Sequence, residues 1–316
     1  MKSRTIRGIS VSELGFGGAS VGNLHRETGD QVAHDAVDAA WDGGVRYFDT
    51  APHYGLGLSE RRLGEALAKR PRDEYAVSTK VGRLLVPNPH AGGGTDLGTG
   101  GFEVPDDVVR QWDFSRDGVR RSLDDSLARL GLDRIDILFV HDPDDFVDQV
   151  IAEAIPALVE LREQGVIGAI GAGMNQWEAP LRMVRETDID VIMLAGRWTL
   201  LDRSGAPLLE AAAERNVSIV DAAPFNSGLL AKDRPPQGAL FNYAPAPPEL
   251  MARADELADL CESDGVTLPA AALQFPLRSP QVKAVVCGMR TAEQVRSTLA
   301  RLAAPIGDQT WAALDG

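Results

Sequence analysis

The sequence predicts a closed (β/α)₈ barrel, the TIM-barrel architecture, preceded by a short N-terminal β-hairpin. Eight short runs rich in Val, Ile, Leu and Phe are typical of strands buried in a parallel sheet. Amphipathic stretches with helical periodicity separate these runs. An eightfold alternation of strand and helix favours a closed barrel over an open doubly wound sheet, which is the competing architecture.

The elements follow one another in a regular order. The hairpin is expected at residues 7–14, and the strands at 15–19, 46–49, 75–80, 135–140, 167–172, 191–194, 217–222 and 282–287. The helices are expected at 30–42, 59–68, 115–131, 149–164, 176–186, 205–215, 248–263 and 291–302. The third helix has the clearest signal, with Ser115 as a plausible N-cap and Gly131 as a plausible C-terminal stop.

Two connecting segments are long and rich in Gly and Pro. Residues 86–102 follow the third strand, and their composition argues against a packed element. The segments 83–114 and 231–248 follow the third and seventh strands, so both should lie at the C-terminal face of the barrel and form substrate loops. The first is the better candidate for a lid. No domain boundary is evident, and we expect one barrel domain over residues 1–316.

Composition excludes several classes of protein. Hydrophobic residues make up 44% of the chain and no 18-residue apolar run occurs, which argues for a globular protein without a membrane span. The N-terminus lacks a secretory signal, so a cytoplasmic location is expected. The protein is expected to be a monomer or a weak oligomer. A net charge of −14 argues against nucleic-acid and membrane partners. The two cysteines and five histidines show no metal-binding spacing, and no metal is expected.

Four polar side chains occupy the expected C-terminal ends of successive strands or follow them closely: Asp49, Tyr54, Lys80 and His141. Barrel active sites are built at this face. Hydride transfer to a carbonyl requires a proton donor, and a free phenol with a pKa of about 10 is a poor one near neutrality. An ammonium beside Tyr54 would lower that pKa, Asp49 would hold Lys80 charged, and His141 would hydrogen-bond the substrate oxygen.

The local motifs around these residues resemble the aldo-keto reductase family. They are YFDTAPHYG (47–55), STK (78–80), LARLGLDRIDILFVHDPD (127–144), IGAGMNQW (170–177), APFNSGLL (223–230) and VVCGMRTAEQV (285–295). The region before and through His141 is similar to the branch that contains L-fucose, D-threo-aldose and pyridoxal dehydrogenases. The resemblance implies that Asp49, Tyr54, Lys80 and His141 are the catalytic set.

The resemblance also implies an NAD or NADP site. The matching cofactor-binding residues are Asn175, Ser227, Gly228, Leu229, Gly288, Met289, Arg290, Thr291 and Gln294. The Ser that often precedes the Asn, the Gln of the sixth strand and the aromatic residue after the seventh are replaced here. Only Arg290 is positively charged in the window from Gly288 to Gln294, so NAD is slightly favoured over NADP.

A small sugar or aldehyde is the expected substrate. The branch resemblance implies oxidation of an aldopyranose, such as L-fucose or a D-threo-aldose, at the anomeric carbon to give a lactone. The candidate substrate-binding residues are His53, Arg83, Trp112, Asp142 and Trp177. The alternatives are a pyridoxal or general aldehyde/ketone reductase and, more remotely, a non-catalytic NAD(P)-sensing subunit. A dinucleotide site of the open-sheet type at residues 15–20 lacks its third glycine.

Overall fold

The computed structural model describes residues 1–242 and 244–316 and contains a closed barrel of eight parallel strands. The strands are β3 (Leu14–Gly17), β4 (Tyr47–Asp49), β5 (Ala76–Val81), β8 (Ile135–His141), β9 (Ile167–Met174), β10 (Val191–Ala195), β11 (Ser218–Ala222) and β14 (Val282–Gly288). The barrel closes through the pairing of β14 with β3. All eight predicted strands are confirmed, and each strand end lies within two residues of its predicted position.

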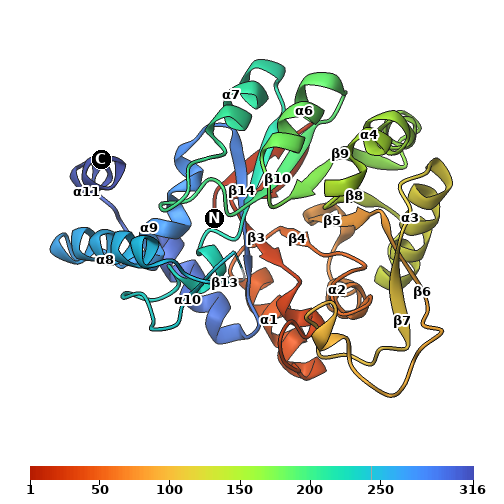
Figure 1. Cartoon of the computed structure of the whole chain (residues 1–316), viewed down its shortest axis with the longest axis horizontal. Coiled ribbons are helices and arrows are strands. Elements are labelled where there is room, and N and C mark those ends of the chain that lie inside the picture. The colour runs from red at the N-terminus through yellow and green to blue at the C-terminus, as the bar shows by residue number, and fades with distance from the viewer. Residues whose placement is uncertain (243) are drawn as a thin grey trace.

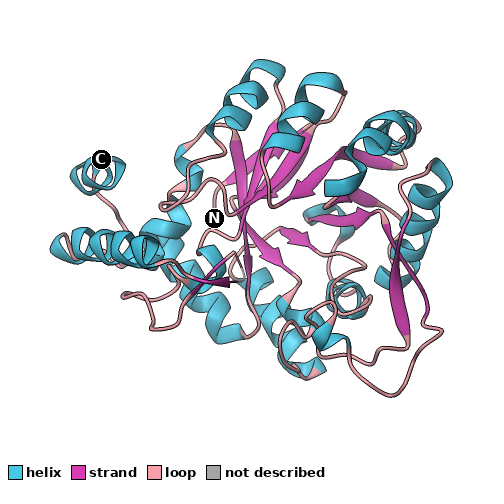
Figure 2. Ribbon diagram, viewed as in Figure 1, coloured by secondary structure: helices cyan, strands magenta, loops and turns pink. Residues whose placement is uncertain are grey.

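Helices surround the strands, as Figures 1 and 2 show. They are α1 (Asp30–Asp42), α2 (Leu58–Leu67), α3 (Arg116–Leu130), α4 (Val147–Gln149), α5 (Ile155–Glu163), α6 (Glu178–Glu186), α7 (Ala206–Arg215), α8 (Pro248–Ser263), α9 (Leu268–Gln274), α10 (Ala292–Ala303) and α11 (Asp308–Asp315). Ser115 caps α3 by accepting a hydrogen bond from the Gly118 amide, and Gly131 ends it in a left-handed conformation, as predicted. The predicted helix at 149–164 contains a π-helical turn at Val150–Ala154. The helices α9 and α11 were not predicted from the sequence.

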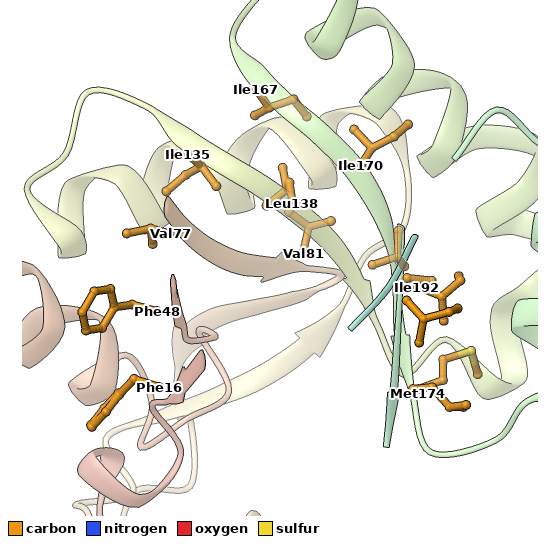
Figure 3. Close-up of a cluster of buried hydrophobic side chains, with 14 of the residues drawn as sticks. Phe16, Phe48, Val77, Val81, Ile135, Leu138, Ile167, Ile170, Met174 and Ile192 are labelled. Atoms are coloured by element: carbon orange, nitrogen blue, oxygen red, sulfur yellow. The ribbon is translucent and has the colours of Figure 1, made fainter. Parts of the chain in front are cut away.

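Side chains alternate along each strand between two apolar layers. Tyr47, Phe139 and Val220 belong to a cluster in the barrel interior, whereas their neighbours pack outward against the helices. Figure 3 shows part of this outer layer, including Phe16, Phe48 and Leu138. The same alternation directs Asp49, Lys80 and His141 inward, because each lies two residues or a multiple of two after an interior residue of its strand.

The N-terminal hairpin exists, but its predicted bounds of 7–14 were wrong. It consists of β1 (Ser3–Ile6) and β2 (Ile9–Ser12), in antiparallel register with Ile6 opposite Ile9. Arg7 and Gly8 form the turn, both with positive φ (46° and 83°). Residues 7 and 8 are therefore the two-residue loop of the hairpin, because a tight turn matching the strand twist requires positive φ at both positions.

The segment 83–114 is more structured than its composition predicts. It contains the antiparallel strands β6 (Arg83–Pro87) and β7 (Val108–Trp112) and a 3₁₀ turn at Asp96–Gly98. Figure 1 shows this hairpin at the periphery of the molecule, far from α8 and α11. Phe102 is buried against Leu56 and Val104, so the expectation that residues 86–102 form no packed element was wrong. The physical reason is that these few large apolar side chains find partners on the barrel rim.

The segment 231–248 contains a minimal strand pair, β12 (Leu240–Phe241) and β13 (Ala244–Pro245). Position 243 of this predicted substrate loop lies outside the described residues. Among the helices that the structure describes, none combines the length and apolarity that crossing a bilayer requires.

Candidate active site

A cavity of about 510 Å³ opens at the carboxyl ends of the barrel strands. All four predicted catalytic residues line it: Asp49, Tyr54, Lys80 and His141. His53, Asp142, Asn175 and Gly288 also line the cavity. The structure thus brings together eight of the residues singled out in the sequence, contributed by five of the barrel strands and the loops that follow them.

The floor of the cavity holds a buried ion pair. Lys80 Nζ lies 2.8 Å and 3.0 Å from the two carboxylate oxygens of Asp49 and donates a third hydrogen bond to the Thr50 carbonyl oxygen at 2.9 Å. Burial alone would lower the pKa of Lys80, but Asp49 and then Tyr54 raise it by more, so its pKa lies above the ordinary value. Lys80 is therefore an ammonium at neutral pH.

Tyr54 lies directly above this pair. Lys80 Nζ is 4.6 Å from the centre of the Tyr54 ring. Burial raises the pKa of the phenol, Lys80 lowers it as expected, and Asp49 raises it again. The net result is a Tyr54 pKa above its ordinary value. The expectation that Lys80 brings this pKa down therefore holds only for the contribution of Lys80, because removal of the phenol from water outweighs it.

Two histidine rings complete the wall beside Tyr54. The His141 ring stands perpendicular to that of Tyr54 at 5.8 Å, and the His53 ring lies 5.6 Å from His141. Burial, followed by the charges of Arg83 and Lys80, holds the pKa of His141 well below its usual range. Burial and the nearby Arg83 and Arg110 lower the pKa of His53 to about 2. Both imidazoles are therefore neutral, and Nδ1 of each is buried with no hydrogen-bond partner among the described residues.

A second hollow of about 220 Å³ adjoins the cavity and shares Asp142 and Asn175 with it. Arg83 and Trp112 line this hollow rather than the main cavity. Arg83 donates to Asp142 at 2.6 Å, and its guanidinium lies 4.5 Å from the centre of the Trp112 ring. Trp177 lines neither space, because it precedes α6 and packs against the outer apolar layer.

The predicted cofactor residues fall into two groups beyond Asn175. The first, Ser227, Gly228 and Leu229, belongs to a turn after β11 in which Asn226, Ser227 and Gly228 all have positive φ. Such consecutive strained residues occur at ligand-binding loops. The Leu229 side chain is fully buried in a separate apolar cluster, and none of these three residues lines the main cavity.

The second group surrounds the start of α10. Thr291 caps this helix, and the Gln294 side chain accepts a hydrogen bond from the Arg290 amide at 2.7 Å. The Arg290 guanidinium donates to the Leu24 and Arg26 carbonyl oxygens and to the Thr28 hydroxyl. Met289 is buried in the outer apolar layer.

Two residues that contact the predicted catalytic set were not predicted from the sequence. The Phe102 ring, from the Gly-rich segment, lines the cavity. Its centre lies 5.2 Å from that of the His53 ring and 6.1 Å from that of the Tyr54 ring. Ser78 donates to Asp49 at 2.7 Å from the next strand. Strand alternation was a usable signal for Ser78, since it lies two residues before Lys80 on β5. No sequence signal distinguished Phe102.

The aldo/keto reductase family model matches residues 13–316. The chain therefore belongs to the aldo/keto reductase family, and it is an oxidoreductase. It is 48% identical to the D-threo-aldose 1-dehydrogenase of a Pseudomonas species over 97% of this chain and 94% of that relative. It is 38% identical to the pyridoxal 4-dehydrogenase of Microbacterium luteolum, with the same coverage.

The fold agrees with that membership. The structure superposes on the holo form of an aldo-keto reductase from Bacillus halodurans with a TM-score of 0.79 and 27% identity, covering 100% of this chain and 95% of the other. Members of this family use a nicotinamide dinucleotide. The cavity suits such a group, because Gly17, Gly173 and Gly288 contribute no side chains to its wall.

Proposed function

We propose that the protein oxidises a neutral aldopyranose at its anomeric carbon to the lactone, with NAD(P) as hydride acceptor. The observation that carries the proposal is the single cavity in which Tyr54, the Lys80–Asp49 pair and a neutral His141 meet. The similarity to an enzyme named D-threo-aldose 1-dehydrogenase supports the substrate class.

The side chains divide the chemistry between them. The bound nicotinamide would supply or accept the hydride. Tyr54 takes the proton of the anomeric hydroxyl during oxidation and returns it during reduction. Lys80 stabilises the phenolate, and Asp49 keeps Lys80 charged and oriented. His141, being neutral, hydrogen-bonds the reacting oxygen without competing for its proton.

The cofactor would lie along the carboxyl edge of the barrel. Asn175 lines the cavity and would bind the nicotinamide amide, while the turn at 227–229 would cover the pyrophosphate. Residues 288–294 would hold the adenosine end, where the N-terminus of α10 favours an anion. We infer a preference for NAD, because the Arg290 guanidinium is engaged by three acceptors of the 24–28 loop.

A substrate panel tests the proposed reaction. Purified protein is assayed with L-fucose, D-threo-aldoses, pyridoxal and simple aldehydes, each with NAD and with NADP. We expect NADH formation with one or more aldoses and release of an acid as the lactone hydrolyses. Absence of turnover with every aldose would refute the proposal, and activity confined to pyridoxal would support the alternative.

The Tyr54→Phe variant tests the assignment of the proton relay. It should lose at least about 100-fold in kcat, the usual contribution of a general acid–base group. NADH affinity, measured by fluorescence titration, should stay near that of the wild type because the ring is retained.

A comparison of the two cofactors tests the inferred preference for NAD. Wild-type protein should bind NADH more tightly than NADPH. Gln294→Arg should reduce this difference in affinity, because it adds a cation at the start of α10.

A further inference from the structure

The second hollow carries a charge pattern that the proton relay does not use. Arg83 and Asp142 form an ion pair, and their side chains are 12% and 23% exposed. Both groups are therefore partly desolvated, yet both line the hollow, and Asp142 also lines the main cavity. Asp142 belongs to the wall of the main cavity and of the hollow, and it follows His141 directly in the chain. A ligand that contacts His141 therefore passes within reach of Asp142.

The pair is held in place from both sides. Trp112 lies under the Arg83 guanidinium at 4.5 Å, and Trp112 itself stacks on Phe114 at 5.6 Å. Asp142 has a left-handed backbone (φ 40°), and its amide donates to the Gly173 carbonyl oxygen at 3.0 Å. A non-glycine residue in this conformation costs free energy, and such costs are concentrated at functional sites.

Hydrogen-bonding capacity is left over in this pair. The Arg83 Nε atom is buried and has no partner among the described residues. The Asp142 carboxylate has Arg83 as its close partner, and His141 Nε2 lies at 3.6 Å. A carboxylate has about four acceptor positions, and a guanidinium has five donors. An adjacent donor and acceptor of this kind match two neighbouring hydroxyl groups of a sugar, each of which both donates and accepts.

The charges of the site also restrict the ligand. Lys80 is balanced by Asp49 and Arg83 by Asp142, while the hollow additionally contains Asp144 and Asp145. A phosphate or carboxylate on the substrate would meet two further carboxylates and, among the described residues that line this hollow, no unbalanced cation. A neutral polyhydroxylated ligand meets no such repulsion.

We propose that Arg83 and Asp142 form a donor–acceptor subsite that binds the neighbouring C2 and C3 hydroxyl groups of an unphosphorylated aldose, next to its reacting anomeric carbon. The subsite selects neutral sugars with free hydroxyls and positions them against Tyr54 and His141. This inference rests on the proposed aldose dehydrogenase function and adds the determinant of its specificity.

A cycle that combines substrate and protein changes tests the subsite. The kcat/KM of wild type and Asp142→Asn is measured with the best aldose and with its 2-deoxy and 3-deoxy forms. Asn keeps the shape of Asp and tolerates the left-handed backbone at this position. For the wild type, we expect kcat/KM to be at least about tenfold higher with the parent sugar than with one or both deoxy forms, since a charged hydrogen bond is worth roughly 1.5–3 kcal/mol. For Asp142→Asn, we expect this difference to fall below about threefold. A phosphate ester of the sugar at a hydroxyl other than the anomeric one should be a poor substrate for the wild type.

Asp148→Asn is the matched control, because Asp148 pairs with Arg182 on the surface at the same distance of 2.6 Å. This control variant should keep the wild-type ratio of kcat/KM between the parent sugar and its deoxy forms. Arg83→Gln tests the subsite from the donor side and replaces Asp142→Asn if that variant does not fold, as judged by its melting temperature. An unchanged ratio in folded variants, with wild-type aldose turnover intact, would refute the subsite alone. No aldose turnover by the wild type would refute the function and the subsite together.

Discussion

Lys80 Nζ and Asp49 Oδ2 lie 2.8 Å apart, and both side chains are almost fully buried, at 2% and 3% exposure. This pair lies beneath the Tyr54 ring and receives support from Ser78, which donates to Asp49 at 2.7 Å. Because two opposite charges are buried together, the loss of one leaves the other without compensation.

The first prediction concerns this pair. Asp49→Asn should lower the free energy of unfolding by about 3–5 kcal/mol, because the Lys80 ammonium would remain buried without a counter-ion. Denaturant unfolding measures the change. The double variant Asp49→Asn with Lys80→Met should be more stable than Asp49→Asn alone. The exposed-pair variant Asp148→Asn should change stability by less than about 1 kcal/mol. A small loss for Asp49→Asn, equal to that control, would contradict the prediction.

The second prediction concerns the pH dependence of catalysis. Burial holds the pKa of His141 well below 6.5 and that of His53 at about 2, so neither ring gains a proton near neutrality. The Tyr54 pKa is raised, so the phenol stays protonated through neutral pH and ionises only at alkaline pH. Reductive kcat/KM should therefore be flat from about pH 6 to 9, and oxidative kcat/KM should rise with pH. A limb between pH 6 and 7 that disappears in His141→Gln would show that His141 titrates.

The third prediction concerns the roof of the cavity. Phe102→Ala should raise KM for the aldose and lower kcat, since the ring that shields His53 and Tyr54 is lost. Truncation of a buried Phe also costs about 3–5 kcal/mol of stability. Leu97→Ala, in the same segment but 41% exposed, should change stability by no more than about 0.5 kcal/mol. Steady-state kinetics and thermal melting compare the two variants. Identical kinetic constants and melting temperatures would mean that the Phe102 ring does not cover the cavity.

The fourth prediction concerns Asp221 on β11. Its carboxyl is fully buried, neither oxygen has a hydrogen-bond partner among the described residues, and burial raises its pKa well above the usual value. In the unfolded chain the Asp221 carboxyl loses its proton near pH 4, whereas in the folded chain it keeps that proton. The free energy of unfolding therefore falls as the pH rises from about 4 towards the pKa of Asp221 in the folded state. The slope is at most about 1.4 kcal/mol per pH unit.

Asp221→Asn removes this titration. The stability difference between the variant and the wild type should therefore grow in favour of the variant between pH 5 and 8. Melting temperatures recorded across this range provide the measurement. Parallel curves for the two proteins would show that Asp221 has an ordinary pKa in the folded state.

Much of the fold could be predicted because hydrophobic periodicity is a local property. Each strand is a short apolar run, and α3 carries its own start and stop signals at Ser115 and Gly131. The hairpin bounds and the strands β6 and β7 were missed because their signals are weak: Arg7 takes a positive φ that its side chain does not favour, and the strands flank a Gly-rich stretch.

For this protein, the sequence alone determined the order of the eight barrel strands and the identity of the four polar side chains at one rim. Both follow from local patterns and from the rule that parallel strands end at a common edge. Only the tertiary structure decided how those side chains behave. Burial keeps His141 neutral and raises the Tyr54 pKa despite the opposing effect of Lys80. The fold also brings Arg83 within hydrogen-bond distance of Asp142, and Arg290 within that distance of the 24–28 loop. These properties depend on desolvation and on distances between residues far apart in the chain, which no local pattern contains.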